Sequence, residues 1–432
     1  MSRIFLGNFD FEHELATLPT PAIRAQSLGG TSKSKSGRAG RFAAERACAW
    51  LAWAQPGDVI LADRRFTAAD FPDLAQAGWP IPQFCSDVDE LPAGPDWELV
   101  PWGWTDSLVT WSRSRGWSGP VPPAEIVRHV NSREFRFGLE RAWNIGLPAA
   151  GLARTLPELE ELIAAAGDLP LGWILKANFG MAGREALRGR GPQLEAHCRN
   201  WAERRLRTTG PIVFEPLVER VAEAGVQVDV PMSAPPVCLG ITPQLVDRSG
   251  VYRGSRFACS TVELADWQPA VDVALRTARE LQSLGYFGPL GIDAMWYRTA
   301  AGELRLRPLQ DLNARLTMGR LSLGWQRLLA NGVAFDARAV GGQGVSPRPL
   351  ENVCHPLRTV GSWIHLSPRQ VAHLGIATQL RQAPGAGGPR WLLTSQQSPA
   401  NHSGQSVVVL AATSADRDQA EAQLLGLATE VY

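Results

Sequence analysis

Apolar residues along this chain follow two alternating patterns, short continuous runs and runs with the spacing of an amphipathic helix. Short runs are typical of buried strands, whereas apolar positions three and four residues apart are typical of helices. The patterns predict strands at 3–6, 59–61, 173–176, 212–217, 226–230 and 237–241, and helices at 41–54, 133–143, 156–166, 192–207, 267–284 and 318–329. Because helices and strands alternate, we expect an α/β fold.

Turn-forming residues divide the chain into three predicted domains. Residues 116–123 are rich in Gly and Pro, as is typical of a linker. From about residue 340 the chain is rich in Gly, Pro and Gln, and beyond this a strand at 407–411 and a helix at 414–427 predict a small C-terminal α/β extension. A chain of 432 residues is long enough for two or three domains. We expect them at 1–125, 126–345 and 346–432.

The composition is that of a globular protein, with 45% apolar and 20% charged residues. A net charge of +1 creates no overall field that would attract nucleic acid or an anionic membrane, so we expect neither partner. The loop 29–40 carries Lys33, Lys35 and Arg38, with Arg41 directly after it, and could hold an anion. Its charges favour a solvated, flexible loop instead.

The cysteines and the N-terminus indicate the compartment. Six cysteines, at 48, 85, 198, 238, 259 and 354, form no CxxC pair and fit no zinc module, so we expect reduced and mostly buried thiols. Cys354 precedes His355, but no helper acid is evident. The first residues lack the apolar run of a signal peptide, and no stretch approaches the roughly 20 apolar residues of a membrane span. These features predict a cytoplasmic protein.

Three oxygen-bearing side chains are predicted to meet on one hairpin. Asp293 ends a short apolar strand, a turn follows, and a second strand leads to Asp311 and Asn313, with Arg315 just beyond. Residues i and i+2 of an extended chain point to the same side, so a hairpin would bring the two acids and the amide together. Such hard oxygen ligands suit Mg²⁺ that nucleotide phosphates also hold. The alternative is a hairpin whose polar residues only close a turn.

A second segment has the features of a phosphate-binding loop. An apolar strand ends in Lys176, and a loop with Gly180 and Gly183 follows. Glycines let backbone amides approach phosphate oxygens, and the lysine adds a positive charge. The segment lacks both the GK[ST] ending of a P-loop and a GxGxxG motif, so alone it is a weak indication.

A third segment, 212–219, is an apolar strand that carries Glu215. An acid inside such a strand is unusual in a core, and the alternative is a strand edge with the acid at the surface. In a nucleotide site, the backbone near Glu215 and Leu217 would pair with adenine, and apolar side chains would enclose the ring. Glu223 could then accept the ribose hydroxyls.

The order of these segments is more specific than any one of them. The segments follow one another as a cation-bearing helix, a strand with Lys176 and a glycine loop, a strand with Glu215 and an apolar hinge, a long helix, an Asp strand and the ending DLNAR. This order resembles that of the ATP-grasp superfamily over roughly residues 128–330. Carboxylate–amine ligases that make peptide-like bonds are the most similar members, and residues 1–125 resemble the preATP-grasp domain. The resemblance implies two α+β lobes that clamp ATP, Mg²⁺ (or Mn²⁺ in its place) and an acyl-phosphate intermediate.

The resemblance also implies a role for each matching residue. Lys176 would contact the α and β phosphates, and Arg315 would steady the transferring phosphoryl group or the substrate carboxylate. The implied Mg²⁺ ligands are Asp293, Asp311 and Asn313, and the other implied nucleotide contacts are Arg133, Arg136, Gly180, Met181, Ala182, Gly183, Glu215, Pro216, Leu217, Val218 and Glu223.

Three positions depart from the family pattern. Asp311 replaces the usual Glu and is one methylene shorter, and Arg133, or Arg136 one turn later, stands where the family has its first nucleotide lysine. Gly291 stands where some members carry an arginine. These departures leave a non-catalytic nucleotide-binding protein open, whereas the retained lysine, metal-type Asp and Asn, and following arginine argue against it.

The turn 247–256 carries three arginines and two glycines. In this fold position it would face the acyl-acceptor side, so Arg253 and Arg256 are candidates for binding a substrate carboxylate. Arg320 is a weaker candidate. The alternative is an ordinary surface hairpin.

The implied reaction joins a carboxylate to an amine. The carboxylate would attack the γ-phosphorus of ATP to give an acyl phosphate and ADP, and an amine would then displace phosphate. The expected substrates are small molecules, an amino acid or a peptide among them, and a homodimer is an option because family members are often dimers. Another ATP-grasp reaction, such as carboxylation or thioester formation, stays open, although the chain shows no biotin attachment sequence.

Overall fold

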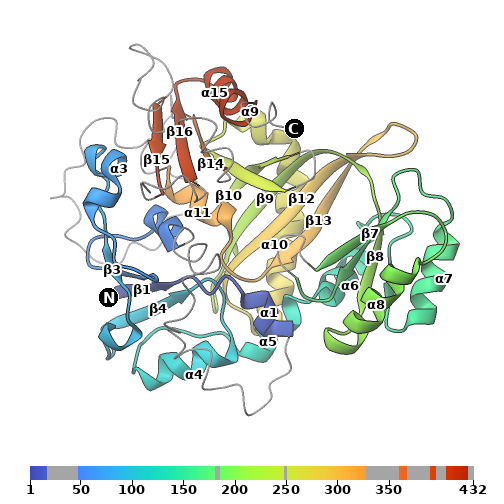
Figure 1. The fold of residues 1–432 in the computed structure, drawn as a ribbon, viewed down its shortest axis with the longest axis horizontal. Coiled ribbons are helices and arrows are strands. Elements are labelled where there is room, and N and C mark those ends of the chain that lie inside the picture. Colours follow the sequence, from blue (N-terminus) through green and yellow to red (C-terminus); the bar gives the residue numbers. More distant parts are fainter. Residues whose placement is uncertain are drawn as a thin grey trace.

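Three β-sheets organise the protein (Figure 1). The computed structural model describes residues 1–16, 47–180, 185–247, 251–326, 360–366, 390–395 and 405–426. Several predictions lie outside these residues, namely those for the loop 29–40, residues 41–46 and 327–329 of two predicted helices, Met181, Ala182 and Gly183, and the pair Cys354 and His355.

A four-stranded parallel sheet forms the N-terminal part, in the order β3-β2-β1-β4. Its strands are β1 (Ser2–Leu6), β2 (Val59–Leu61), β3 (Gln83–Cys85) and β4 (Trp97–Pro101). Around it lie α1 (Phe11–Ala16), α3 (Pro72–Gln76), α4 (Asp106–Ser114) and the 3₁₀ helices Cys48–Ala52, Ala68–Asp70 and Val88–Glu90. Ile4, Phe5 and Ile60 of its central strands have no exposed surface, as expected for a parallel sheet.

An eight-stranded sheet forms the centre of the molecule, in the order β13-β12-β9-β10-β11-β14-β16-β15. Each of its strands is antiparallel to its neighbours. Its strands are β9 (Glu219–Val230), β10 (Val237–Val246), β11 (Tyr252–Phe257), β12 (Gly288–Arg298), β13 (Leu304–Asn313), β14 (Val360–Leu366), β15 (Arg390–Leu393) and β16 (Gln405–Ala411). The helices α10 (Gln268–Ser283) and α11 (Met318–Gly324) contact this sheet.

A smaller four-stranded sheet lies at one end of the molecule (Figure 1), in the order β5-β8-β6-β7. Its strands are β5 (Gly151–Ala153), β6 (Trp173–Ala177), β7 (Ala186–Gly189) and β8 (Ile212–Pro216), and it packs with α7 (Leu156–Ala166) and α8 (Ala196–Thr208). The helices α5 (Ala124–Val130) and α6 (Arg133–Trp143) lie between the N-terminal and the smaller sheets in the chain, and α6 contacts both β13 and β8. The prediction of an α/β fold with two α+β lobes is confirmed.

Most of the predicted elements are confirmed. The helices α6 and α7 have the predicted bounds, and the Ser132 hydroxyl caps α6 by accepting a hydrogen bond from the Phe135 amide. The main error is β11, which the sequence presented as a turn because of its arginines and glycines. Gly254 is needed in this strand and does not mark a turn, because a Cβ there would lie 2.2 Å from the Trp363 carbonyl oxygen of the neighbouring strand.

The C-terminal strands extend the central sheet instead of forming a sheet of their own. β14 pairs with β11, so the order continues directly from the central strands into β16 and β15. The Leu393 amide also donates to the Asp73 carboxylate of α3 at 3.0 Å, which joins this segment to the N-terminal part. The predicted strand and helix near the C-terminus are confirmed as β16 and α15 (Ser414–Gly426), while the domain boundaries stay predictions.

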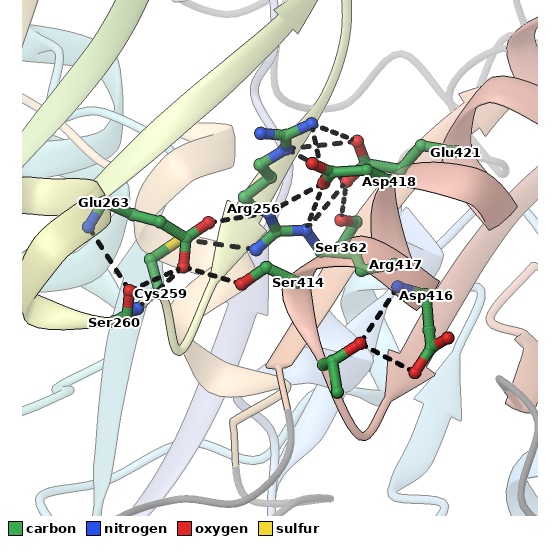
Figure 2. Close-up of polar contacts among 11 residues, drawn as sticks. Arg256, Cys259, Ser260, Glu263, Ser362, Ser414, Asp416, Arg417, Asp418 and Glu421 are labelled. Atoms are coloured by element: carbon green, nitrogen blue, oxygen red, sulfur yellow. Dashed lines mark hydrogen bonds and ion pairs between the residues drawn. The ribbon is translucent and has the colours of Figure 1, made fainter.

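A network of charged side chains fixes α15 on the sheet (Figure 2). Arg256 of β11 binds Glu421 of α15 through Nε and Nη2, and Glu421 also accepts a hydrogen bond from the Ser362 hydroxyl. Arg417, which has no exposed surface, lies 2.7 Å from the Glu263 carboxylate of α9 (Thr261–Leu264). The nearby Cys259 thiol is inert, because burial raises its pKa to about 12.

Arg417→Met should destabilise the protein by about 3 kcal/mol, because it removes a fully buried cation and leaves the Glu263 carboxylate without its positive partner. Unfolding in urea, followed by tryptophan fluorescence, measures the change. Arg298→Met is the matched control, since the Arg298 guanidinium lies 3.7 Å from Glu219 in an exposed pair. Such pairs contribute about 0–1 kcal/mol, so equal losses in the two variants would contradict the structural role of Arg417.

No helix among the described residues is both long and apolar enough to cross a lipid bilayer.

Candidate active site

The hairpin β12–β13 brings two of the predicted metal ligands into direct contact. Asp293 is opposite Asp311 and Gly291 is opposite Asn313 in the strand register. The Asn313 amide donates from Nδ2 to Asp293 Oδ2 at 3.3 Å. The other Asp293 oxygen accepts a hydrogen bond of 2.7 Å from Gln244 on β10. The side chains of Asp293 and Asn313 therefore share one place on the central sheet.

The surroundings of Asp293 disfavour its negatively charged form. Burial and, to a smaller extent, the negative charges of Asp311 and Glu223 raise the pKa of Asp293 to about 7. In the part of the chain that the structure describes, no three His, Cys, Asp or Glu side chains are placed to hold a metal alone. The hard oxygens of Asp293, Asp311 and Asn313 fit Mg²⁺ if phosphate oxygens complete its shell.

The metal-free protein should lose stability as the pH rises from about 4 to about 7. The pKa of Asp293 rises from an ordinary 3.8 to about 7 on folding, so the folded state binds this proton more tightly than the unfolded state. Its contribution is present below the unfolded pKa and is lost as the pH passes the folded pKa. Melting temperatures in EDTA at pH 5 and pH 8 test this, and Asp293→Asn should show a smaller decrease between the two pH values than wild type.

Arg315 connects this site to the N-terminal part of the molecule. Its Nε donates to Glu12 Oε1 on α1 at 2.6 Å, and its Nη2 donates to Asn313 Oδ1 at 2.9 Å. The guanidinium carbon also lies 5.2 Å from the ring centre of Trp102. The Asn313 amide thus contacts Arg315 through its oxygen and Asp293 through its nitrogen.

Lys176 lies on the opposite, smaller sheet and is paired with Glu215. Its Nζ is 2.7 Å from Glu215 Oε2. Burial lowers the pKa of Lys176, the charge of Glu215 raises it, and the charge of Asp311 also acts to raise it. The lysine of β6 and the acid of β13 are therefore near enough to interact, so the two sheets present opposite charges toward one region.

Glu215 belongs to a buried ion cluster of five residues. Arg136 and Glu140 come from α6, Arg307 comes from β13, and Lys176 and Glu215 come from β6 and β8. Arg307 holds the pKa of Glu215 well below its usual range, with Lys176 and Arg136 adding to the effect. Three cations face two carboxylates, so the buried ion cluster carries one positive charge in excess.

Both α6 arginines for which nucleotide contacts are implied have partners within this chain. Arg136 is only 1% exposed and donates to Glu140 and Glu215, so its guanidinium is engaged inside the buried ion cluster. Arg133 donates to the carbonyl oxygens of Ala177 and Gly180, the latter at 3.1 Å. Arg133 therefore supports the start of the loop after β6 instead of presenting a free charge.

The implied adenine hinge is partly occupied by the chain itself. The Leu217 amide donates to the Gly172 carbonyl oxygen at 2.8 Å, and the Glu215 side chain is buried with the cations. Val218 packs beside a small apolar cluster that contains Met295. Within this segment the Leu217 amide and the Glu215 carboxylate are therefore already bonded inside the chain.

The implied ribose acid, Glu223, has a partner in this chain. Arg220 Nη1 donates to Glu223 Oε1 at 3.0 Å, and Glu223 is 8% exposed. Because its charge also acts on Asp293, Glu223 lies near the acidic place on the central sheet.

The three arginines predicted to bind a substrate carboxylate each bind a carboxylate of this chain. Arg253 pairs with Asp247 at 2.7 Å, Arg256 belongs to the network around α15, and the buried Arg320 donates to Asp229 at 3.2 Å. These partners already neutralise the charges that a substrate carboxylate would need. The proposed site therefore does not include Arg253, Arg256 and Arg320.

Four site residues were missed by the sequence reasoning, Glu12, Glu140, Gln244 and Arg307. Each touches a predicted residue, but each comes from a segment that carries no motif. The one available signal was the acid at position 140 and the arginine at 307 in otherwise amphipathic or strand-like patterns. Charged residues at core-facing positions are rare unless paired, and this could have indicated a buried ion cluster.

Solved structures with the same architecture exist. N5-carboxyaminoimidazole ribonucleotide synthetase from Thermus thermophilus is 12% identical, covers 99% of this chain and 98% of its own, and gives a TM-score of 0.51. The corresponding synthetase from Staphylococcus aureus, complexed with ADP, is 9% identical over 99% of this chain and 96% of its own, also with a TM-score of 0.51. This chain has the ATP-grasp fold.

Sequence comparison adds one curated relative. A segment of 81 residues is 40% identical to the [butirosin acyl-carrier protein]–L-glutamate ligase of Niallia circulans. The match spans 18% of this chain and 18% of that relative, less than a fifth of its length. No known family model matches the chain. The likeness to the solved structures shows the fold, and the matching segment of 81 residues does not show the activity.

Proposed function

We propose that the protein is an ATP-dependent ligase that joins a carboxylate to an amine through an acyl phosphate and releases ADP and phosphate. The observation that supports this most is the arrangement of charge between the two sheets. Asp293, Asp311 and Asn313 offer hard oxygens on the central sheet, and Lys176 faces them from the smaller sheet with a positive charge in excess. A Mg²⁺–triphosphate carries the complementary charges for both walls.

Each wall would have a defined part in phosphoryl transfer. Asp293, Asp311 and Asn313 would hold Mg²⁺, which neutralises charge on the phosphates. Lys176 would bind phosphate oxygens as a point charge, and Arg315, held by Glu12, would keep Asn313 in place beside the reacting group. The chain's main contribution is then alignment of the carboxylate with the γ-phosphorus, and shielding of the acyl phosphate from water.

The proposal predicts that ADP and phosphate are released only when both a carboxylate and an amine are present. Purified protein with Mg²⁺ and ATP is assayed for ADP, AMP and phosphate, first with mixtures of the twenty amino acids and then with single acid and amine pairs. Trapping the acyl phosphate with hydroxylamine as a hydroxamate identifies the acid. Release of AMP instead of ADP would contradict the acyl-phosphate mechanism.

Two further assays extend the set of carboxylate substrates that is tested. Bicarbonate with an amine tests carboxylation, which the names of the structurally similar synthetases suggest. An acyl-carrier protein tests a carrier-bound substrate, because the curated relative joins glutamate to such a carrier. ATP binding without any turnover in all arms would favour the non-catalytic alternative.

A further inference from the structure

Glu215 has more cationic partners than one carboxylate needs. Arg307 donates from Nη1 to Oε2 at 3.0 Å and from Nη2 to Oε1 at 2.7 Å, and Arg136 donates to Oε1 at 2.9 Å. Lys176 is the third cation, 2.7 Å from Oε2. If Lys176 moved away, both oxygens of Glu215 would therefore still have an arginine as partner.

Arg307 is itself fixed from a second side. Its Nε and Nη2 donate to the two oxygens of Glu140 at 2.7 and 3.0 Å, and it is 2% exposed. Glu140 lies on α6, Glu215 on the smaller sheet and Arg307 on the central sheet. Because its guanidinium is hydrogen-bonded to two buried carboxylates, Arg307 stays in place when the Lys176 side chain moves away from Glu215.

We propose that Arg307 is a positioning residue for the nucleotide, which keeps Glu215 neutralised so that Lys176 can leave it for a phosphate group of ATP. This inference rests on the proposed function, in which Lys176 binds phosphate. Without Arg307, the departure of Lys176 would strip Glu215 Oε2 of a partner inside the protein. Unpaired buried carboxylate oxygens are costly, so Lys176 would stay with Glu215 and the nucleotide would bind weakly.

The choice of a lysine at position 176 agrees with this role. The chain has 43 Lys and Arg residues, and the lysines among them are Lys33, Lys35 and Lys176. An arginine would form a fork with the carboxylate of Glu215, whereas an ammonium group on a flexible stem is a point charge that can exchange partners. The buried ion cluster thus holds two cations that stay and one that can move.

Two variants test the inference by the dissociation constant of MgATP, measured by calorimetry. The double variant Arg307→Met/Glu140→Gln removes one cation and one carboxylate, so the buried ion cluster keeps its excess of one positive charge. We expect its dissociation constant to rise about tenfold, since Glu215 Oε2 loses its arginine. Arg307→Lys keeps the charge but cannot bridge both carboxylates, and we expect a smaller rise.

Arg305→Met is the matched control. Arg305 lies two residues before Arg307 on the same strand and pairs with Glu303 at the surface. The Arg305→Met variant should have the same dissociation constant for MgATP as wild type. Melting temperatures of all variants establish that the protein is folded in each measurement.

The pKa of Lys176 gives a readout that loss of stability alone would not change. Reductive methylation with ¹³C-formaldehyde labels the three lysines and the N-terminus, and NMR titration reports each pKa. Of the groups that act on Lys176, Arg307 and Arg136 lower its pKa, and Glu215 and Asp311 raise it. In Arg307→Met/Glu140→Gln the pKa of Lys176 should be higher than in wild type, with Lys176→Arg used to assign the signal.

The outcomes separate this inference from the proposed function. Wild-type protein that fails to bind MgATP would contradict the proposed function and the inference with it. Binding by wild type, together with an unchanged dissociation constant and an unchanged Lys176 pKa in the folded variants, would overturn only the role of Arg307. A tenfold weaker binding with a raised pKa supports the role.

Discussion

Asp293→Asn should reduce the rate of ADP formation about 1,000-fold, which corresponds to about 4 kcal/mol of transition-state stabilisation. Asp293 contributes a carboxylate to the place where Mg²⁺ would bind, and the amide has a weaker oxygen ligand and no charge. The fold should persist, because the protein already disfavours the charged form of the buried Asp293 carboxyl group, whose pKa is raised to about 7, and an asparagine carries no charge. Steady-state rates at saturating ATP and Mg²⁺, with the acid and amine identified in the screen, measure the effect.

Asp272→Asn is the control for this prediction. Asp272 lies on the exposed face of α10 and accepts a hydrogen bond from Gln268, so the same chemical change occurs away from the site. Its rate should match that of wild type. If Asp293→Asn retained more than a tenth of the wild-type rate, the assignment of Asp293 to the ion would be wrong.

Lys176→Met should weaken MgATP binding roughly 100-fold, since a charge-assisted hydrogen bond contributes about 1.5–3 kcal/mol. The fold should survive this change because Glu215 keeps Arg136 and Arg307 as partners. Calorimetric titration with MgATP, and with MgADP for comparison, measures the loss for each nucleotide.

Lys176→Arg distinguishes charge from mobility. The variant keeps the positive charge, but its fork would bind Glu215 and stay there, so we expect it to bind MgATP less tightly than wild type. Equal affinity of wild type and Lys176→Met would show that the phosphates are bound elsewhere.

The sequence predicted the elements whose patterns are local. The amphipathic helix α6, its Ser132 cap and the hairpin β12–β13 follow from spacing within one short segment. β11 could not be read in this way, because a strand with Arg253, Gly254 and Arg256 has the composition of a turn. What makes it a strand is pairing with β14, which begins more than 100 residues later in the chain.

The same difference between local and distant contacts applies to the candidate site. Asp293, Asp311 and Asn313 could be predicted together, since one hairpin fixes their relation. The partners of the predicted cations could not, because Arg315 meets Glu12 and Arg307 meets Glu140 across long separations in the chain. A single sequence indicates that a charge is present, but not which opposite charge the fold brings to it.

The continuous pairing from β11 into β14 has a practical consequence for shortening the protein. A version cut after Gln326 would retain Asp293 and Lys176 but would lose the strand that covers one side of β11. β11 would then be an exposed edge strand, and its unpaired backbone amides and carbonyls could pair with strands of other molecules. Such a truncated version should precipitate during expression.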